Sequence, residues 1–139
     1  MAELVEGPIE VGRLLAMAAR PDCGAVVLFL GTTRDHHEGR EVVRLEYEAY
    51  RPMALAALER AERDTVERHA VASCRIVHRI GVVPPAEASV AVAVAAAHRN
   101  AAFDACRWAM DQVKRTATIW KKEHYAGGDA GWVVGAMLG

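Results

Sequence analysis

The stretch VAVAVA at residues 90–95 alternates valine with alanine at every position. Successive side chains of a β-strand point to opposite faces, so this pattern predicts a strand with one bulky face and one thin face. The thin alanine face suits the close packing of a helix or of another strand. Pro84 and Pro85 separate this strand from the apolar residues before it, because proline cannot donate a hydrogen bond within a sheet.

Pairs of strands alternate with helices on both sides of this stretch. The apolar run GAVVLFL at residues 24–30 is typical of a strand that is buried on both faces. Alternate residues of VVRLEYEAY at 42–50 are apolar, which predicts a half-exposed strand whose inner face carries Val43, Leu45, Tyr47 and Ala49. Further strands are expected at 74–83, 119–123 and 131–134, and helices at 10–20, 53–69 and from an Asn100 N-cap to about Arg115.

This order of elements predicts an α+β fold with a mixed or mainly antiparallel sheet, two main helices and a short N-terminal helix. Strict alternation of strand and helix, which is typical of doubly wound folds, is absent. A chain of 139 residues fits one domain, which we expect to span residues 1–139 with residues 126–139 as a flexible tail. A chain of this size can fold without a disulfide or a metal.

The composition excludes several classes of protein. Hydrophobic residues make up 53% of the chain, which is incompatible with disorder. Lysine and arginine number 17 and the acidic residues 18, so a net charge of −1 gives no general electrostatic reason for binding nucleic acid or an anionic membrane. No window approaches the roughly 18 apolar residues of a membrane span.

The cysteines and the N-terminus indicate a reduced, cytoplasmic protein. Cys23, Cys74 and Cys106 are far apart and form no CxxC motif, so we expect small buried thiols. The acidic start MAELVEGPIEVGR lacks the basic residues and apolar run of a signal peptide. Since His36, His37 and His124 form no recognisable ligand pattern, we expect neither a metal nor a cofactor.

Cationic residues at the ends of predicted elements are the best candidates for chemistry. Arg34 lies in a polar loop after the first apolar run, where a guanidinium could clamp a phosphate or carboxylate or simply be solvated. His98 and Arg99 precede the predicted Asn100 helix, whose N-terminus favours small anions. The alternative is a flanking pair that only solvates the loop.

Three lysines follow. Lys114 near a helix C-terminus could simply complement the helix dipole. If residues 119–123 are extended, Lys121 shares a face with Glu123, and Lys122 points to the opposite side. A lysine among apolar groups can have a lowered pKa and serve as an acid, base or nucleophile. A surface ion pair between Lys121 and Glu123 is the alternative.

Five blocks of residues, taken together, resemble the family of molybdopterin synthase catalytic (large) subunits. Each block is weak alone, but their order and spacing match the family over about residues 24–134. Thr118, where many members have proline, and Ala86–Glu87, where they often have Gly followed by an acid, are departures. The blocks are GAVVLFLGTTRDHHEG at 24–39, LEYEAYRPMA at 45–54, HRIGVV at 78–83, AHRNAAF at 97–103 and IWKKE at 119–123.

The resemblance implies an α/β-hammerhead fold and a sulfurtransferase of molybdenum cofactor biosynthesis. It implies a homodimer in which each copy binds one small ubiquitin-like sulfur carrier, giving a heterotetramer. The carrier's C-terminal Gly-Gly thiocarboxylate enters a pocket and donates sulfur to cyclic pyranopterin monophosphate, which becomes the dithiolene of molybdopterin. No metal or cofactor of the subunit's own is implied.

The resemblance also implies which residues act. Lys114 and Lys121 match the lysines regarded as catalytic. The residues expected to bind substrate are Thr32, Thr33, Arg34, His98, Arg99, Lys122 and Glu123. We expect Arg34, His98 and Arg99 to converge on one pocket. The alternative function is a non-catalytic dimeric module that binds an anionic metabolite or a partner's C-terminal tail.

Overall fold

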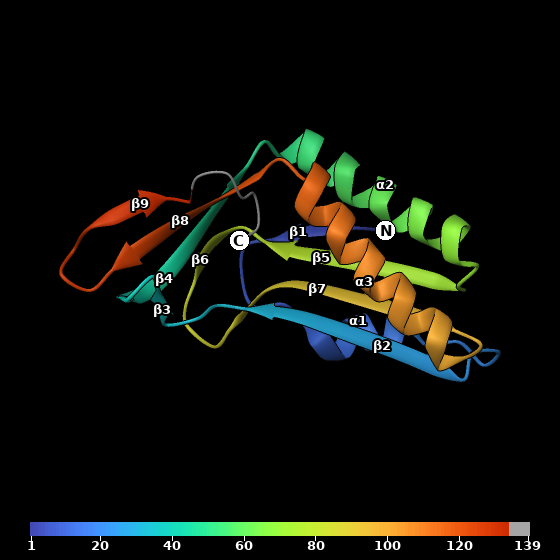
Figure 1. The fold of residues 1–139 in the computed structure, drawn as a ribbon. Helices are drawn as coiled ribbons and strands as arrows, with labels where there is room; N and C mark the ends of the chain where they lie inside the picture. Colours follow the sequence, from blue (N-terminus) through green and yellow to red (C-terminus); the bar gives the residue numbers. More distant parts are fainter. Residues whose placement is uncertain (134–139) are drawn as a thin grey trace.

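The computed structural model describes residues 1–133, and its elements form two sheets and three helices (Figure 1). None of the helices within these residues is long and apolar enough to cross a membrane. In chain order the elements are β1 (Glu3–Val5), α1 (Val11–Ala18), β2 (Ala25–Thr32), β3 (His36–His37), β4 (Arg40–Ala49), α2 (Arg51–His69), β5 (Ser73–Arg79), β6 (Gly81–Val83), β7 (Ala88–Ala96), α3 (Arg99–Thr116), β8 (Ile119–Tyr125) and β9 (Ala130–Trp132).

The first sheet has the strand order β1-β5-β7-β2, with β1 parallel to β5 and the other pairs antiparallel. Helices α2 and α3 pack side by side on one face of this sheet, and α1 lies on the other face (Figure 1). The three helices and the mixed sheet confirm the predicted α+β fold class.

The valine–alanine strand β7 lies inside this sheet and forms its core. Val90, Val92 and Val94 pack in the main apolar cluster beneath α2 and α3. On the opposite face, Ala91 and Ala93 pack in a second cluster with residues of α1. The small alanine side chains let this short helix approach the sheet closely, as the thin face predicts.

The second sheet has the order β3-β4-β8-β9, with β6 also paired to β4. The chain enters this sheet at Gly81, whose φ of +91° is a conformation that glycine adopts without strain. The single strand predicted at 74–83 is therefore wrong: β5 belongs to the first sheet, and β6 belongs to the second.

Three smaller expectations are also corrected. A register shift between Val42 and Arg44 leaves Val42 2% exposed and Val43 37% exposed, so Val43 does not join the inner face of β4. Helix α3 is capped by the backbone of His98, so Asn100 lies within the helix. Of the tail predicted at 126–139, residues up to 133 include a turn and β9, and 134–139 lie outside the described residues.

The apolar strand β2 is not buried on both faces, contrary to expectation. It forms the edge of the first sheet, and within residues 1–133 it pairs only with β7. Its side chains Val26, Phe29 and Leu30 are 37–41% exposed. An apolar edge strand is a template for pairing with another chain, so this edge is a candidate interface.

The cysteines largely follow the prediction. Cys74 and Cys106 are buried, and Cys23 is partly buried. Burial raises the pKa of Cys74 to about 12 and that of Cys106 to about 11, so both remain thiols at neutral pH.

Close packing between β7 and α1 can be tested by enlarging an alanine. Ala93→Leu adds three carbons to a fully buried site and should lower the free energy of unfolding by about 1–3 kcal/mol, because the core cannot expand without strain. Urea denaturation measures the loss. The exposed Ala56→Leu in α2 serves as the control and should change stability by less than about 0.5 kcal/mol.

Candidate active site

A cavity of about 460 Å³ is lined by residues from both sheets and from α3. Five of the predicted site residues line it, and they come from β2, the loop after it, α3 and β8. They are Thr32, Arg34, Lys114, Lys121 and Glu123. The fold thus gathers three cations and one carboxylate from distant parts of the sequence into one concave site, which is the usual form of a small-molecule site.

Lys121 reaches this cavity from β8, where it lies opposite Tyr47 of β4. Burial lowers the pKa of Lys121, the Glu123 carboxylate raises it, and the charges of Arg34 and Lys114 lower it again. The net effect is a pKa below the ordinary value for lysine. A lysine with a lowered pKa is suited to proton transfer.

Glu123 is 5% exposed and is held by two hydrogen bonds at the same oxygen. Its Oε1 accepts the Tyr125 hydroxyl at 2.7 Å and lies 2.8 Å from Nδ1 of His37, which donates when that nitrogen carries the proton. Burial raises the pKa of Glu123, but these bonds outweigh burial and hold the pKa below its ordinary value. The alternative of a surface ion pair between Lys121 and Glu123 is therefore wrong, since Glu123 is buried and bonded elsewhere.

Hydroxyl groups bridge the two sheets beside Lys121. The Tyr47 hydroxyl donates to Oγ of Ser89 at 3.3 Å, and the Ser89 hydroxyl donates to the carbonyl of Gly31 at 3.2 Å. Burial raises the pKa of Tyr47, so its phenol stays neutral. The His78 ring packs edge-on against Tyr47 at 5.0 Å, and burial lowers its pKa to about 4, so this imidazole is neutral as well.

Sequence reasoning did not select His37, Tyr47 or Ser89, although all three line the cavity. The pair His36–His37 was considered only as a metal ligand. The inward alternation of β4 was a usable signal for Tyr47. No sequence signal identifies His37, because its partner Glu123 lies 86 residues further along the chain.

Four predicted residues lie outside this cavity. His98 and Arg99 are at the N-terminal end of α3, and 15 residues separate Arg99 from Lys114, which is about 22 Å along a helix. Arg34, His98 and Arg99 therefore do not converge within one chain, contrary to expectation. Thr33 is buried, and its backbone bonds to residues of the turn before β7. Lys122 points to the other face of β8, with Nζ 5.4 Å from the ring centre of Trp132.

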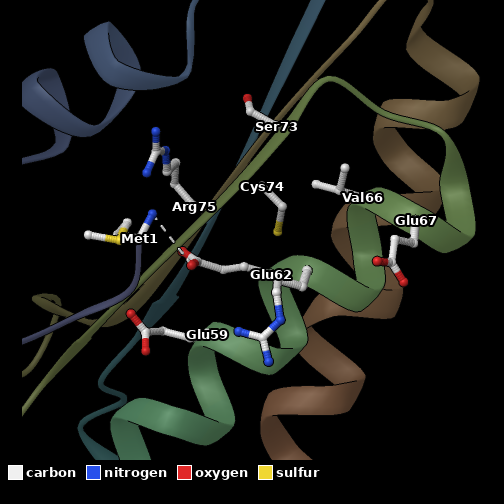
Figure 2. Close-up of a pocket in the computed structure, with 9 residues that line it drawn as sticks. Met1, Glu59, Glu62, Val66, Glu67, Ser73, Cys74 and Arg75 are labelled. Carbon is white, nitrogen blue, oxygen red and sulfur yellow. Dashed lines mark ion pairs between the residues drawn. The ribbon is translucent and has the colours of Figure 1, made fainter.

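A second cavity, of about 470 Å³, is lined by residues of α2 and β5 and is drawn in Figure 2. It contains none of the predicted site residues. Glu62 accepts the backbone N–H of Ile76 at 2.8 Å and lies 3.5 Å from the amino group of Met1. These contacts account for its buried carboxylate, so the cavity beside Lys121 is the stronger candidate for chemistry.

No group of three or more potential metal ligands occurs among residues 1–133.

Known proteins are similar to this chain in both sequence and fold. The profile of the MoaE protein family matches residues 4–116. The molybdopterin synthase catalytic subunit of Culex quinquefasciatus is 46% identical over 121 residues, which cover 86% of this chain and 77% of that protein. The crystal structure of molybdopterin synthase from Staphylococcus aureus matches with a TM-score of 0.90 and 34% identity, over 94% of this chain and 95% of that chain.

The fold also recurs in a complex from Helicobacter pylori of subunits 1 and 2 of molybdopterin-converting factor, with a TM-score of 0.78, 17% identity, and coverage of 96% of this chain and 90% of that chain. That likeness concerns the fold alone. The profile match and the close relatives establish that the chain belongs to the MoaE family, the catalytic subunits of molybdopterin synthase.

Proposed function

We propose that this chain transfers sulfur from the C-terminal thiocarboxylate of a small ubiquitin-like carrier to cyclic pyranopterin monophosphate, forming the dithiolene of molybdopterin. Membership of the MoaE family supports the reaction. The observation that carries the proposal here is the cavity in which Arg34, Lys114 and Lys121 surround the place where an anion would bind. The carrier as partner is supported by the Helicobacter pylori complex, which joins two subunits.

The cavity residues match what this chemistry requires. Sulfur attack needs the thiocarboxylate oriented, the departing phosphate oxygen neutralised and protons moved. Arg34 offers a bidentate fork for phosphate or carboxylate, and Lys114 adds a second positive charge. Lys121, whose pKa is lowered, is the group we assign to proton transfer, which is typically worth about 10²–10⁴ in rate.

We further propose that the site is completed by a second copy of the chain, paired through β2. A twofold axis perpendicular to β2 pairs this edge strand antiparallel with its copy. The first residues of β2 lie beside the end of β7 at Ala96, and His98 and Arg99 follow after one more residue. Arg34 stands two residues beyond the end of β2. Antiparallel pairing of β2 with its copy therefore brings His98 and Arg99 of one protomer toward Arg34 of its partner. The exposed Val26, Phe29 and Leu30 supply the apolar contact.

Replacing Lys121 separates an enzyme from a binding module. Lys121→Arg keeps the positive charge but cannot release a proton, because a guanidinium stays protonated in proteins. This variant should bind the carrier normally and lose about 10²-fold or more in dithiolene formation. Lys122→Arg, on the opposite face of β8, should stay within about threefold of the unchanged protein. Near-normal turnover by Lys121→Arg would favour the non-catalytic binding module.

Mixing two inactive variants tests the shared site. Arg99→Ala and Lys121→Ala homodimers should each be nearly inactive, but a dimer with one chain of each kind has one intact site. Random assortment makes about half the dimers mixed, and each mixed dimer has one intact site of two. Co-expression should therefore give about one quarter of the activity of the unchanged protein. If purified mixed dimers are as inactive as their parents, Arg99 and Lys121 do not act across the dimer.

A further inference from the structure

Lys121 and Glu123 lie two residues apart on the same face of β8, yet they do not pair. Side chains at such positions start about 7 Å apart, a gap that a lysine can span. Among the ion pairs closer than 4.0 Å within residues 1–133, Glu123 is joined to His37 and not to Lys121. Other contacts therefore hold the Glu123 carboxylate away from the Lys121 ammonium.

The two hydrogen bonds of Glu123 supply that restraint. Tyr125 donates from the next inward position of β8, on the side of Glu123 away from Lys121. His37 approaches from the separate short strand β3. Both act on Oε1, so together they fix the carboxylate in one orientation.

The backbone around His37 is itself held in place. Glu38 and Gly39 both have positive φ, 50° and 80°, which makes the link between β3 and β4 a tight two-residue hairpin. Arg40, which follows the turn, stacks its guanidinium 3.7 Å from the ring centre of Tyr125 and pairs with Asp129 at 3.0 Å. Both contacts lie C-terminal to Glu123, one in β8 and one in the turn before β9, and they fasten the hairpin that carries His37.

We propose that His37 is a positioning residue which, together with Tyr125, holds the Glu123 carboxylate away from Lys121 and leaves that amine free for the substrate. The importance of Lys121 in turnover rests on the proposed function, whereas the geometry of Glu123 does not.

The charges around Lys121 and His37 decide how the pKa of Lys121 responds when the Glu123 carboxylate is released. Arg34 and Lys114 already lower the pKa of Lys121, while Glu38 at 3.9 Å faces the other nitrogen of His37. A carboxylate released from His37 and Tyr125 can turn to Lys121 and pair with it. A direct ion pair typically raises a lysine pKa by about one unit or more, which cuts the fraction of free amine about tenfold.

The test is a pH titration of Lys121 in the protein alone. The chain has only three lysines, Lys114, Lys121 and Lys122, so labelling lysine with ¹³C at the ε carbon gives three NMR signals to assign. In the double variant His37→Leu with Tyr125→Phe, the Lys121 midpoint should rise by about one pH unit. In the same variant carrying Glu123→Gln as well, the rise should vanish, because no carboxylate remains to pair.

Two further variants exclude a general effect of the mutations. In His37→Asn the amide nitrogen is two bonds from Cβ, as Nδ1 is in histidine, so a donor to Glu123 remains. The Lys121 midpoint of this variant should equal that of the unchanged protein. His124→Leu breaks the comparable His124–Glu46 contact of 2.9 Å on the opposite face of β8 and should leave the Lys121 midpoint unchanged.

An unchanged Lys121 midpoint in the double variant, or an equal rise with and without Glu123→Gln, overturns the proposal. At pH values below the Lys121 midpoint, the double variant should form dithiolene about tenfold more slowly than the unchanged protein. If the midpoint rises as expected and turnover does not fall, His37 keeps its positioning role and Lys121 loses its role in proton transfer. The two proposals can therefore fail separately.

Discussion

The register of β8 against β4 is the constraint on which the candidate site depends. It sets Lys121 opposite Tyr47 and Glu123 opposite Leu45, with all four side chains directed toward the cavity. Because the side chains of a strand alternate with a period of two, a slip by one residue would bring Lys122 inward and send Lys121 to the outer surface. The register of the two strands thus decides which lysine faces the cavity.

Several contacts hold that register. Ile119, at the start of β8, is fully buried in the main core, and Leu45 of β4 is buried there too. Burial of these apolar residues penalises a slip, because a one-residue shift would expose them to water. The buried Glu123 adds a polar requirement, since a slip of β8 would take its carboxylate away from His37 of β3. Packing and hydrogen bonding therefore select the same arrangement.

Local patterns in the sequence predicted most of the elements, and they failed where a contact between distant segments decides the outcome. The alternation of residues 90–95 correctly predicted the two faces of β7, and the extended reading of 119–123 correctly put Lys121 and Lys122 on opposite sides. Strand β2 was misjudged, because an apolar run shows that a strand will be covered and does not show by what. The break at Gly81 was missed, since a single glycine does not reveal that the chain changes sheets there.

The residues of the candidate site were likewise predicted in part from the sequence. Residue chemistry and the family resemblance selected Arg34, Lys114, Lys121 and Glu123, which the fold brings to one cavity. The expected convergence of His98 and Arg99 with Arg34 on one pocket is not met within one chain, because the length of α3 separates Arg99 from Lys114. The sequence also offers a clue that only the structure makes meaningful: fourteen of its seventeen basic residues are arginine. Within residues 1–133, Arg34 is the one arginine that lines the cavity, whereas two of the three lysines line it, and an ammonium group can give up a proton where a guanidinium cannot. That restriction argues for chemistry at Lys121 over simple anion binding, which arginine would serve as well.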